Sequence, residues 1–185
     1  KHIYILRMAR KRSTKRKKFT HEDYCSSDGM LTQVWGPSMW HFLHTMSFNY
    51  PVNPTAAEKK NYHKFLDTMK YVLPCGHCRK NLTRNYKKVP ITQKTLKNRD
   101  SLSRYIFDLH ERINKQLGKK SGLSYDAVRD RYENFRSRCH TKKKRKHKEA
   151  GCIDSVHGTK SRCLIRIVPH TRKCPTMVVD KKCTA

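Results

Sequence analysis

Residues 99–118 read RDSLSRYIFDLHERINKQLG, and their apolar positions recur every three or four residues. Such spacing places them on one face of an α-helix, and the glycine that follows them is typical of a helix end. The positions are Leu102, Tyr105, Ile106, Leu109, Ile113 and Leu117, followed by Gly118. The segment therefore predicts a long amphipathic helix that needs other elements to cover its apolar face.

The same kind of spacing predicts more helices on either side. A helix follows Trp35-Gly36-Pro37, where Pro37 suits a first turn, and its face carries Trp40, Leu43, His44 and Ser47. A second carries Phe65, Leu66, Met69 and Leu73 and ends at Pro74, and a short third carries Cys75, Cys78 and Leu82. A last one carries Tyr125, Val128, Tyr132 and Phe135, with Ser124 as its N-cap. Strand-like alternation is absent here, so we expect an all-α bundle over residues 31–138.

Charge divides the rest of the chain. The 185 residues carry a formal net charge of +29, and only 36% of them are hydrophobic. About +9 falls in residues 1–20, about +10 in 21–138 and about +10 in 139–185, so the two ends are the basic parts per residue. We therefore expect a basic N-terminal arm at 1–30, a basic linker at 139–151 and a Cys-rich extension at 152–185.

Two basic runs, at residues 10–18 and 142–148, have no apolar periodicity and are predicted to be arms or linkers. Their charge suits a phosphate backbone such as that of nucleic acid, an acidic protein surface or nuclear import, and a solvated tail is the alternative. No zinc-finger spacing, RNP-like strand or clear helix-turn-helix indicates sequence-specific nucleic-acid binding. The apolar patch at residues 3–6 is too short to span a bilayer, and no membrane span is expected.

The stretch Leu73-Pro74-Cys75-Gly76-His77-Cys78-Arg79 places two thiols two residues apart at a predicted helix start. Such a dithiol can close and reopen a disulfide, because the helix N-terminus and the adjacent basic side chains favour a thiolate. The alternative is half of a zinc site, with His63, His77 or His110 as further ligands. No second Cys-x-x-Cys supports that alternative.

Polar residues also lie on the predicted apolar faces. His44 follows Trp40 by four residues, and Asn114 follows His110 by four, so each pair shares a helix face. A lone buried histidine is usually structural. Two of them, together with two tryptophans and a dithiol, indicate a site for a flat heterocyclic electron acceptor.

These ordered motifs resemble the Erv/ALR family of flavin-dependent sulfhydryl oxidases, over about residues 31–136. The resemblance rests on Trp35-Gly36-Pro37 with Trp40 and His44, on the Cys75–Cys78 motif, and on the block from His110 to Lys119. In style the chain is most similar to members from large DNA viruses. Glu111 departs from the family, since it replaces the second residue of a His-Asn pair, and Ile113 replaces a valine.

The resemblance implies a four-helix bundle plus one short helix that holds FAD, usually as a homodimer. Cys78 would reduce the flavin, Cys75 would exchange with protein dithiol clients, and dioxygen would reoxidise the flavin to give hydrogen peroxide. The catalytic pair would thus be Cys75 and Cys78, with no metal. The FAD-binding residues would be Trp35, Gly36, Trp40, His44, His110, Asn114, Lys119, Lys120 and Tyr132.

Six cysteines lie outside this motif: Cys25, Cys139, Cys152, Cys163, Cys174 and Cys183. The even spacing of the last four favours disulfide loops, and residues 163–168 and 177–179 are predicted to form short strands. A shuttle thiol that relays oxidation to clients is one alternative, and free or metal-bound thiols are another. The extra disulfide that braces the last helix in many cellular family members has no obvious counterpart.

Two classes of function follow from the sequence. The first is a thiol oxidase that makes disulfides in viral or other client proteins. The second is a virion structural protein, a minor capsid or core component, built on an oxidase-like bundle whose basic arms bind capsid proteins or nucleic acid. Either class predicts residence in the virion or in the host cytoplasm at the viral assembly site.

Overall fold

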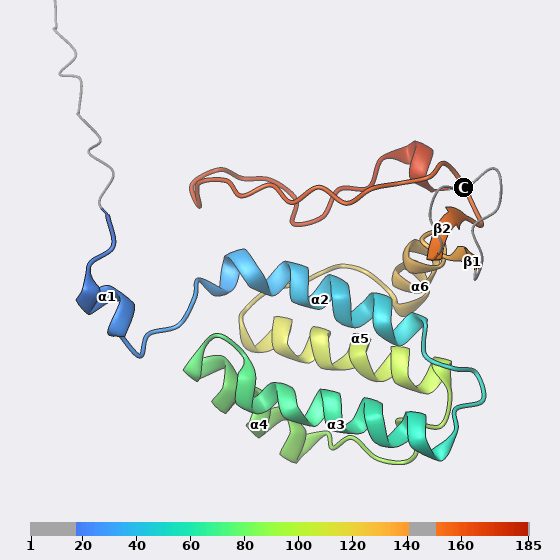
Figure 1. The fold of residues 1–185 in the computed structure, drawn as a ribbon, viewed down its shortest axis with the longest axis horizontal. Coiled ribbons are helices and arrows are strands. Elements are labelled where there is room, and N and C mark those ends of the chain that lie inside the picture. Colours follow the sequence, from blue (N-terminus) through green and yellow to red (C-terminus); the bar gives the residue numbers. More distant parts are fainter. Residues whose placement is uncertain (1–17, 141–150, 185) are drawn as a thin grey trace, which may run out of the picture.

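The computed structural model describes residues 18–140 and 151–184. Six α-helices, two strands and one short 3₁₀ helix occur in that part of the chain (Figure 1). The helices are α1 (His21–Cys25), α2 (Thr32–Phe48), α3 (Ala56–Val72), α4 (Gly76–Lys88), α5 (Arg99–Gln116) and α6 (Tyr125–Glu133). The strands β1 (Ser137–His140) and β2 (Gly151–Ser155) follow, and η1 (Lys181–Cys183) lies near the C-terminus.

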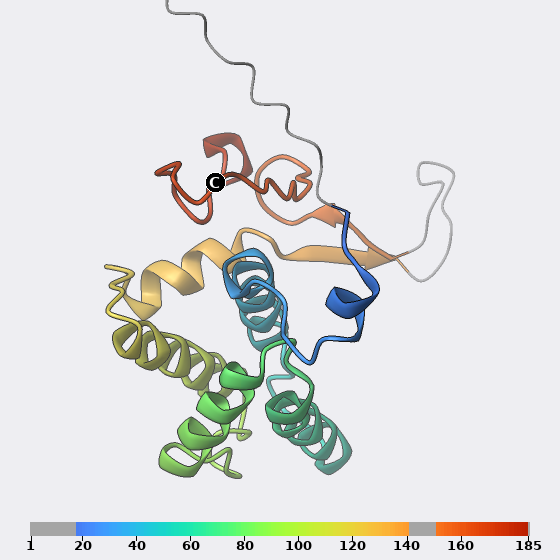
Figure 2. The ribbon, with the colours of Figure 1, turned by 90° about the vertical axis from the view of Figure 1, so that its left-hand side faces the viewer.

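Four of the helices, α2 to α5, surround one hydrophobic core, and α6 crosses beside α2 (Figure 2). The core is built from the apolar faces predicted above, with Leu43, Leu66, Leu82, Leu102 and Ile106 all buried. The burial of these side chains supplies the main driving force for packing the helices. The predicted all-α arrangement, a four-helix bundle plus one short helix, is confirmed.

Helix ends follow local sequence signals in most places. Thr55 and Ser124 accept backbone hydrogen bonds as N-caps of α3 and α6, and Gly118 adopts φ +67° just after α5. The predicted start of α2 was wrong, because the helix begins at Thr32 and Pro37 lies inside it rather than in its first turn. Pro37 has no N–H to donate within the helix, and the helix nevertheless continues to Phe48.

After α6 the chain forms a small antiparallel hairpin. In β1 and β2, Ser137 pairs with Ser155 and Cys139 with Cys152, and a disulfide links these two cysteines. Arg136, just before β1, donates a 2.9 Å hydrogen bond to the carbonyl of Phe48 and so ties the hairpin to the end of α2. The boundary expected between residues 138 and 139 therefore falls inside a strand.

The C-terminal extension differs from the expectation. Residues 163–168 and 177–179 form no strand, and Cys163, Cys174 and Cys183 are free thiols. Leu164, Ile165 and Ile167 are 69–77% exposed, so these β-prone residues have no surface to pack against. The one disulfide in the described residues, Cys139–Cys152, joins the segment after the bundle to the extension and closes no loop inside it.

Both basic runs fall almost wholly outside the described residues, so the predictions for them stay predictions. Within the described part of the chain, no helix combines the length and hydropathy that a bilayer crossing requires.

Candidate functional site

The two motif cysteines lie at the start of α4. Cys75 is the N-cap residue, and its sulfur accepts a hydrogen bond from the backbone N–H of Cys78 at 3.2 Å. Both thiols are free and only partly exposed. The free N–H groups and the dipole of the helix start favour negative charge on the cap sulfur.

The two sulfurs differ in their electrostatics. A hydrogen bond from the Cys78 thiol lowers the pKa of the Cys75 thiol, whereas burial raises the pKa of Cys78. Cys78 packs against the hydrophobic core. Cys75 is therefore the better nucleophile, and Cys78 is the inner sulfur.

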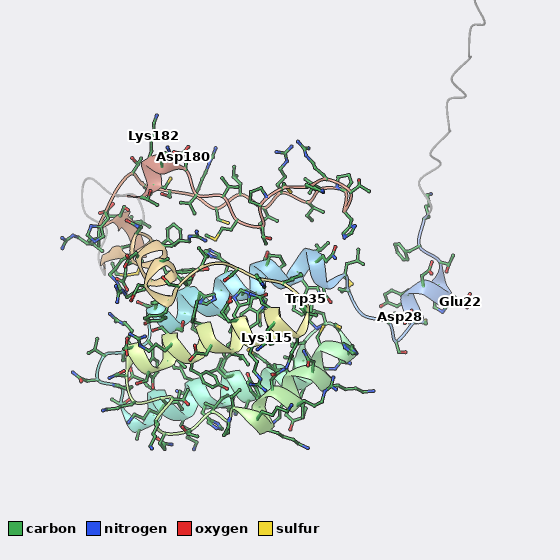
Figure 3. All side chains as sticks on the ribbon, turned by 180° about the vertical axis from the view of Figure 1, so that it is seen from behind. Glu22, Asp28, Trp35, Lys115, Asp180 and Lys182 are labelled. Carbon is green, nitrogen blue, oxygen red and sulfur yellow. A yellow bond between two sulfur atoms is a disulfide. The ribbon has the colours of Figure 1, made fainter. Side chains whose placement is uncertain are left out.

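The segment that precedes α2 lies directly on this dithiol. The N–H of Met30 donates to the carbonyl of Pro74 at 2.8 Å, and the indole N–H of Trp35 donates to the carbonyl of Met30 at 3.1 Å. Thr32 Oγ1 lies 3.5 Å from Cys78 Sγ. Figure 3 shows Trp35 at the N-terminal end of α2, where this segment joins the bundle.

A second cluster, of aromatic rings and histidines, joins α2, α5 and α6. The rings of Trp40 and His110 stack with centroids 4.0 Å apart and planes 7° apart. Nε2 of His44 lies 3.0 Å from Nδ1 of His110, and Nδ1 of His41 lies 3.2 Å from the hydroxyl of Tyr132. The structure thus brings Trp40, His44, His110 and Tyr132 together, as the resemblance implied.

Burial favours the neutral forms of His44, His110 and Tyr132. It lowers the pKa of His44 to about 3 and that of His110 to about 4. It also raises the pKa of Tyr132 to about 12. Nδ1 of His44 is buried, and the described residues give it no hydrogen-bond partner. His44, His110 and Tyr132 therefore present uncharged donors and acceptors to any ligand.

The end of α5 places the remaining predicted residues. The side-chain amide of Asn114 donates to Glu111 at 3.0 Å, so the carboxylate that departs from the family pattern already engages it. The backbone N–H of Lys119 donates to the carbonyl of Asn114 at 2.8 Å, which places Lys119 directly after the end of α5. Lys120 is exposed beyond Gly118, and Gly36 is buried within α2.

Sequence reasoning missed three features of the site. His41 shares its helix face with His44 at a spacing of three, which is a signal that was present. Thr32 and the contact between Met30 and Pro74 had no local signal, because each joins residues more than 40 positions apart.

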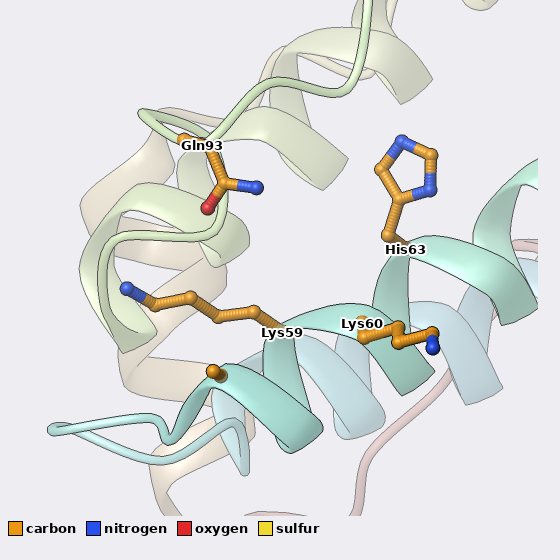
Figure 4. Close-up of a pocket in the computed structure, with 5 residues that line it drawn as sticks. Lys59, Lys60, His63 and Gln93 are labelled. Carbon is orange, nitrogen blue, oxygen red and sulfur yellow. The ribbon is translucent and has the colours of Figure 1, made fainter.

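A hollow on the α3 side of the bundle is a further candidate for a ligand site. Lys59, Lys60, His63 and Gln93 line a hollow of about 450 Å³ between α3 and the loop after α4 (Figure 4). Lys59 and Lys60 point in opposite directions, so their charges do not converge on one ligand. Among the described residues no group of three or more histidine, cysteine or acidic side chains lies together in a way that fits a metal ion.

A helical bundle that presents a reactive Cys-x-x-Cys at a helix start, with a neutral aromatic–histidine cluster between its helices, defines a dithiol redox protein as the class. The Erv1/Alr family model matches residues 37–133, more than half of the chain. This chain belongs to the Erv1/Alr family.

Relatives of the family share this part of the chain. A probable FAD-linked sulfhydryl oxidase of Acanthamoeba polyphaga mimivirus is 38% identical over 99 residues, which cover 54% of this chain and 69% of that protein. An FAD-linked sulfhydryl oxidase of African swine fever virus is 29% identical over a region that covers 54% of this chain and 80% of that protein. The mitochondrial FAD-linked sulfhydryl oxidase ERV1 of Saccharomyces cerevisiae is 29% identical, over 45% of this chain and 43% of its own length.

Solved structures show the same fold. A crystal structure of a mutant of Saccharomyces cerevisiae Erv1 superposes with a TM-score of 0.51 at 23% identity, covering 58% of this chain and 87% of that one. The FAD-binding domain of the same protein gives a TM-score of 0.50 at 25% identity, and the match covers 56% of this chain and 94% of that one. The family fold therefore lies in the bundle.

Proposed function

We propose that this protein is an FAD-linked thiol oxidase that forms disulfides in client proteins by exchange at Cys75 and Cys78. The observation that carries the proposal is the pair of free, unequal thiols in the same bundle as the neutral cluster around His44 and His110. The names of the relatives support the same reaction. They give no support to the alternative of a virion structural protein.

The exchange chemistry follows from the two sulfurs. A client thiolate attacks Cys75 Sγ of the Cys75–Cys78 disulfide, the S–S bond breaks, and Cys78 leaves as a thiolate. The second client thiol, as its thiolate, then displaces Cys75, so the client leaves with a disulfide and this protein holds two reduced sulfurs. Cys75 suits the outer role because the inner sulfur, Cys78, is packed against the core.

The cluster fits a flat cofactor. The buried Nδ1 of His44 has no hydrogen-bond partner among the described residues, and the half-buried ring pair of Trp40 and His110 offers a stacking surface. We propose that these residues and Trp35, Gly36, Asn114, Lys119, Lys120 and Tyr132 hold FAD. The chemistry that bound FAD supplies is the acceptance of two electrons from a dithiol and their transfer to dioxygen, which gives hydrogen peroxide.

The proposal is tested with the purified full chain. We expect a visible flavin spectrum, oxygen consumption with dithiothreitol, and loss of turnover in Cys75→Ser and Cys78→Ser. Cys163→Ser is the matched control, because this exposed thiol lies in the extension and should leave turnover unchanged. A colourless protein that cannot be reconstituted with FAD would contradict the proposal.

A homodimer is part of the proposal. Phe42 of α2 and Phe65 of α3 are 50% and 40% exposed, with ring centroids 6.1 Å apart, and Val34 and Val72 are exposed on the same two helices. An apolar face of this kind suits a second copy of the chain. Sedimentation should give a dimer that Phe42→Glu dissociates, whereas the exposed tail substitution Val178→Glu should not.

The proposal also covers where the protein acts and which macromolecules its basic runs bind. The viral relatives support an infected cell as the place where this protein acts. Packaging into the virion, and binding of capsid proteins or nucleic acid through the basic runs, remain predictions. Binding to DNA that falls steeply with added salt, and is lost when residues 10–18 are replaced by neutral ones, would support the polyanion prediction.

A further inference from the structure

Two helix N-termini meet at the dithiol. One is the start of α4, where Cys75 is the N-cap. The other is the start of α2, whose first residue, Thr32, places its hydroxyl oxygen 3.5 Å from Cys78 Sγ. The 17-residue helix α2 has no side-chain cap and no acidic residue in its first turn, so nothing there offsets its positive end.

The contact between Thr32 and Cys78 is held in place by backbone. We call residues 29–32 the clasp. Its Met30 N–H donates to the carbonyl of Pro74, and a Cβ on Gly29 would lie 2.6 Å from that same oxygen and 2.9 Å from Cys75 Cα. Only a glycine allows the clasp to approach the motif this closely. The position of Thr32 is therefore fixed relative to the sulfurs.

The basic side chains nearest to the motif do not offer a hydrogen bond to Cys78 Sγ in the described part of the chain. Arg79 is the nearest basic residue along the chain, and its guanidinium donates to the carbonyl of Leu73 at 2.6 Å. His77 and Lys80 are exposed on α4. Thr32 is thus the residue whose hydroxyl lies within hydrogen-bond distance of the inner sulfur.

We infer that Thr32 is a further catalytic residue, which donates a hydrogen bond to Cys78 as negative charge develops on that sulfur during exchange. This inference rests on the proposed function. When a client thiolate bonds to Cys75 Sγ, the electron pair of the broken S–S bond goes to Cys78 Sγ. A thiolate cannot donate, so the Thr32 hydroxyl is the donor in that state. Stabilising the leaving thiolate speeds the exchange.

The test is a single-turnover reaction without oxygen. The full chain with the Cys75–Cys78 disulfide formed is mixed with excess glutathione, and the loss of that disulfide is followed by acid quenching and mass spectrometry. Thr32→Val removes the hydroxyl at nearly constant volume, and we expect its rate to fall by roughly 3- to 10-fold. Thr32→Ala should slow the reaction to the same extent, and Thr32→Ser should retain most of the rate.

Thr45→Val is the matched control, since Thr45 is on the same helix and its hydroxyl donates to the carbonyl of His41. Its rate should equal that of the parent protein. Equal rates for the parent, Thr32→Val and Thr32→Ala would overturn the inference and leave the proposed function standing. A parent disulfide that glutathione does not reduce would instead count against the proposed function itself.

Discussion

His44 and His110 join α2 to α5 through one hydrogen bond, with 3.0 Å between Nε2 of His44 and Nδ1 of His110. One ring must donate and the other accept, so two fully protonated rings cannot share this contact. When the proton of a neutral His44 is on Nε2, His44 donates and Nδ1 of His110 accepts. A hydrogen bond between two neutral rings is therefore consistent with the pKa values of both histidines, which burial lowers.

This pair predicts a loss of stability in acid. The folded pKa values, about 3 for His44 and about 4 for His110, lie below the ordinary 6.5, so the unfolded chain binds more protons between about pH 4 and 6.5. The stability that this pair contributes is complete above pH 6.5 and declines as the pH falls toward 4. Urea unfolding should show a loss of up to about 6 kcal/mol between pH 7 and pH 4, since each ring contributes about 3 kcal/mol over that range.

A substitution separates this pair from other groups that titrate in acid. His110→Phe keeps a ring against Trp40 but removes a titrating group and the hydrogen bond, so it should flatten the pH dependence. His63→Phe, on the exposed face of α3, should not. Equal pH slopes for the parent protein and His110→Phe would show that the pair does not set the acid limit.

The unequal thiols predict selective alkylation. Since the pKa of Cys75 is lowered and that of Cys78 is raised, iodoacetamide at neutral pH should modify Cys75 first in the reduced protein. Fragmentation of the peptide that contains both residues reads out the order. In Cys78→Ala the thiol donor to Cys75 is removed, so Cys75 should react more slowly at low pH. Faster labelling of Cys78 than of Cys75 in the parent protein would reverse the assigned roles.

Local patterns predicted most of this fold, because apolar spacing and caps report on single helices. Leu102, Ile106 and Leu109 are buried as the period required. The clasp was not predictable, since the bond from Met30 to Pro74 depends on how α2 and α4 pack. The strand prediction at residues 163–168 failed because β-prone side chains form strands only where another strand or surface pairs with them.

The presence of Glu111 beside Asn114 predicts that a substitution can raise the affinity for FAD. The Glu111 carboxylate accepts a hydrogen bond from the Asn114 amide and adds a negative charge beside residues that we propose to hold FAD, a cofactor that itself carries negative phosphates. Glu111→Asn should free Asn114 and remove the repulsion, so the Kd for FAD should fall by roughly 3- to 10-fold. Equilibrium titration of the apoprotein with FAD, followed by flavin fluorescence, measures the change.

The control for Glu111→Asn is Asp108→Asn. Asp108 is exposed on the same helix, so this variant removes one negative charge without changing the contact with Asn114. A gain in affinity for Glu111→Asn alone would assign the effect to the contact with Asn114. Equal gains for both variants would assign it to net charge, and no gain for either would place the FAD phosphates away from Glu111.

The Cys139–Cys152 disulfide predicts a local stabilisation of the hairpin. It closes a segment with a sequence separation of 13, and closing about 15 residues is worth roughly 3 kcal/mol in chain entropy. The hairpin meets the bundle mainly through Arg136, which pairs with Glu133 at 2.6 Å and reaches Phe48. Cys139→Ser should therefore speed amide hydrogen exchange in β1 and β2 while α5 keeps its protection.

Peptide mapping verifies the bond and supplies the control. Trypsin digestion of the denatured, thiol-blocked protein should yield one species that joins the Cys139 peptide to the Cys152 peptide and separates on reduction. Cys163→Ser should leave both this species and the exchange pattern unchanged, because Cys163 is a free thiol. Faster exchange throughout α5 in Cys139→Ser would contradict a purely local effect. It would mean that the hairpin stabilises the bundle, because opening of β1 and β2 would then weaken the contacts of Arg136 and loosen the core.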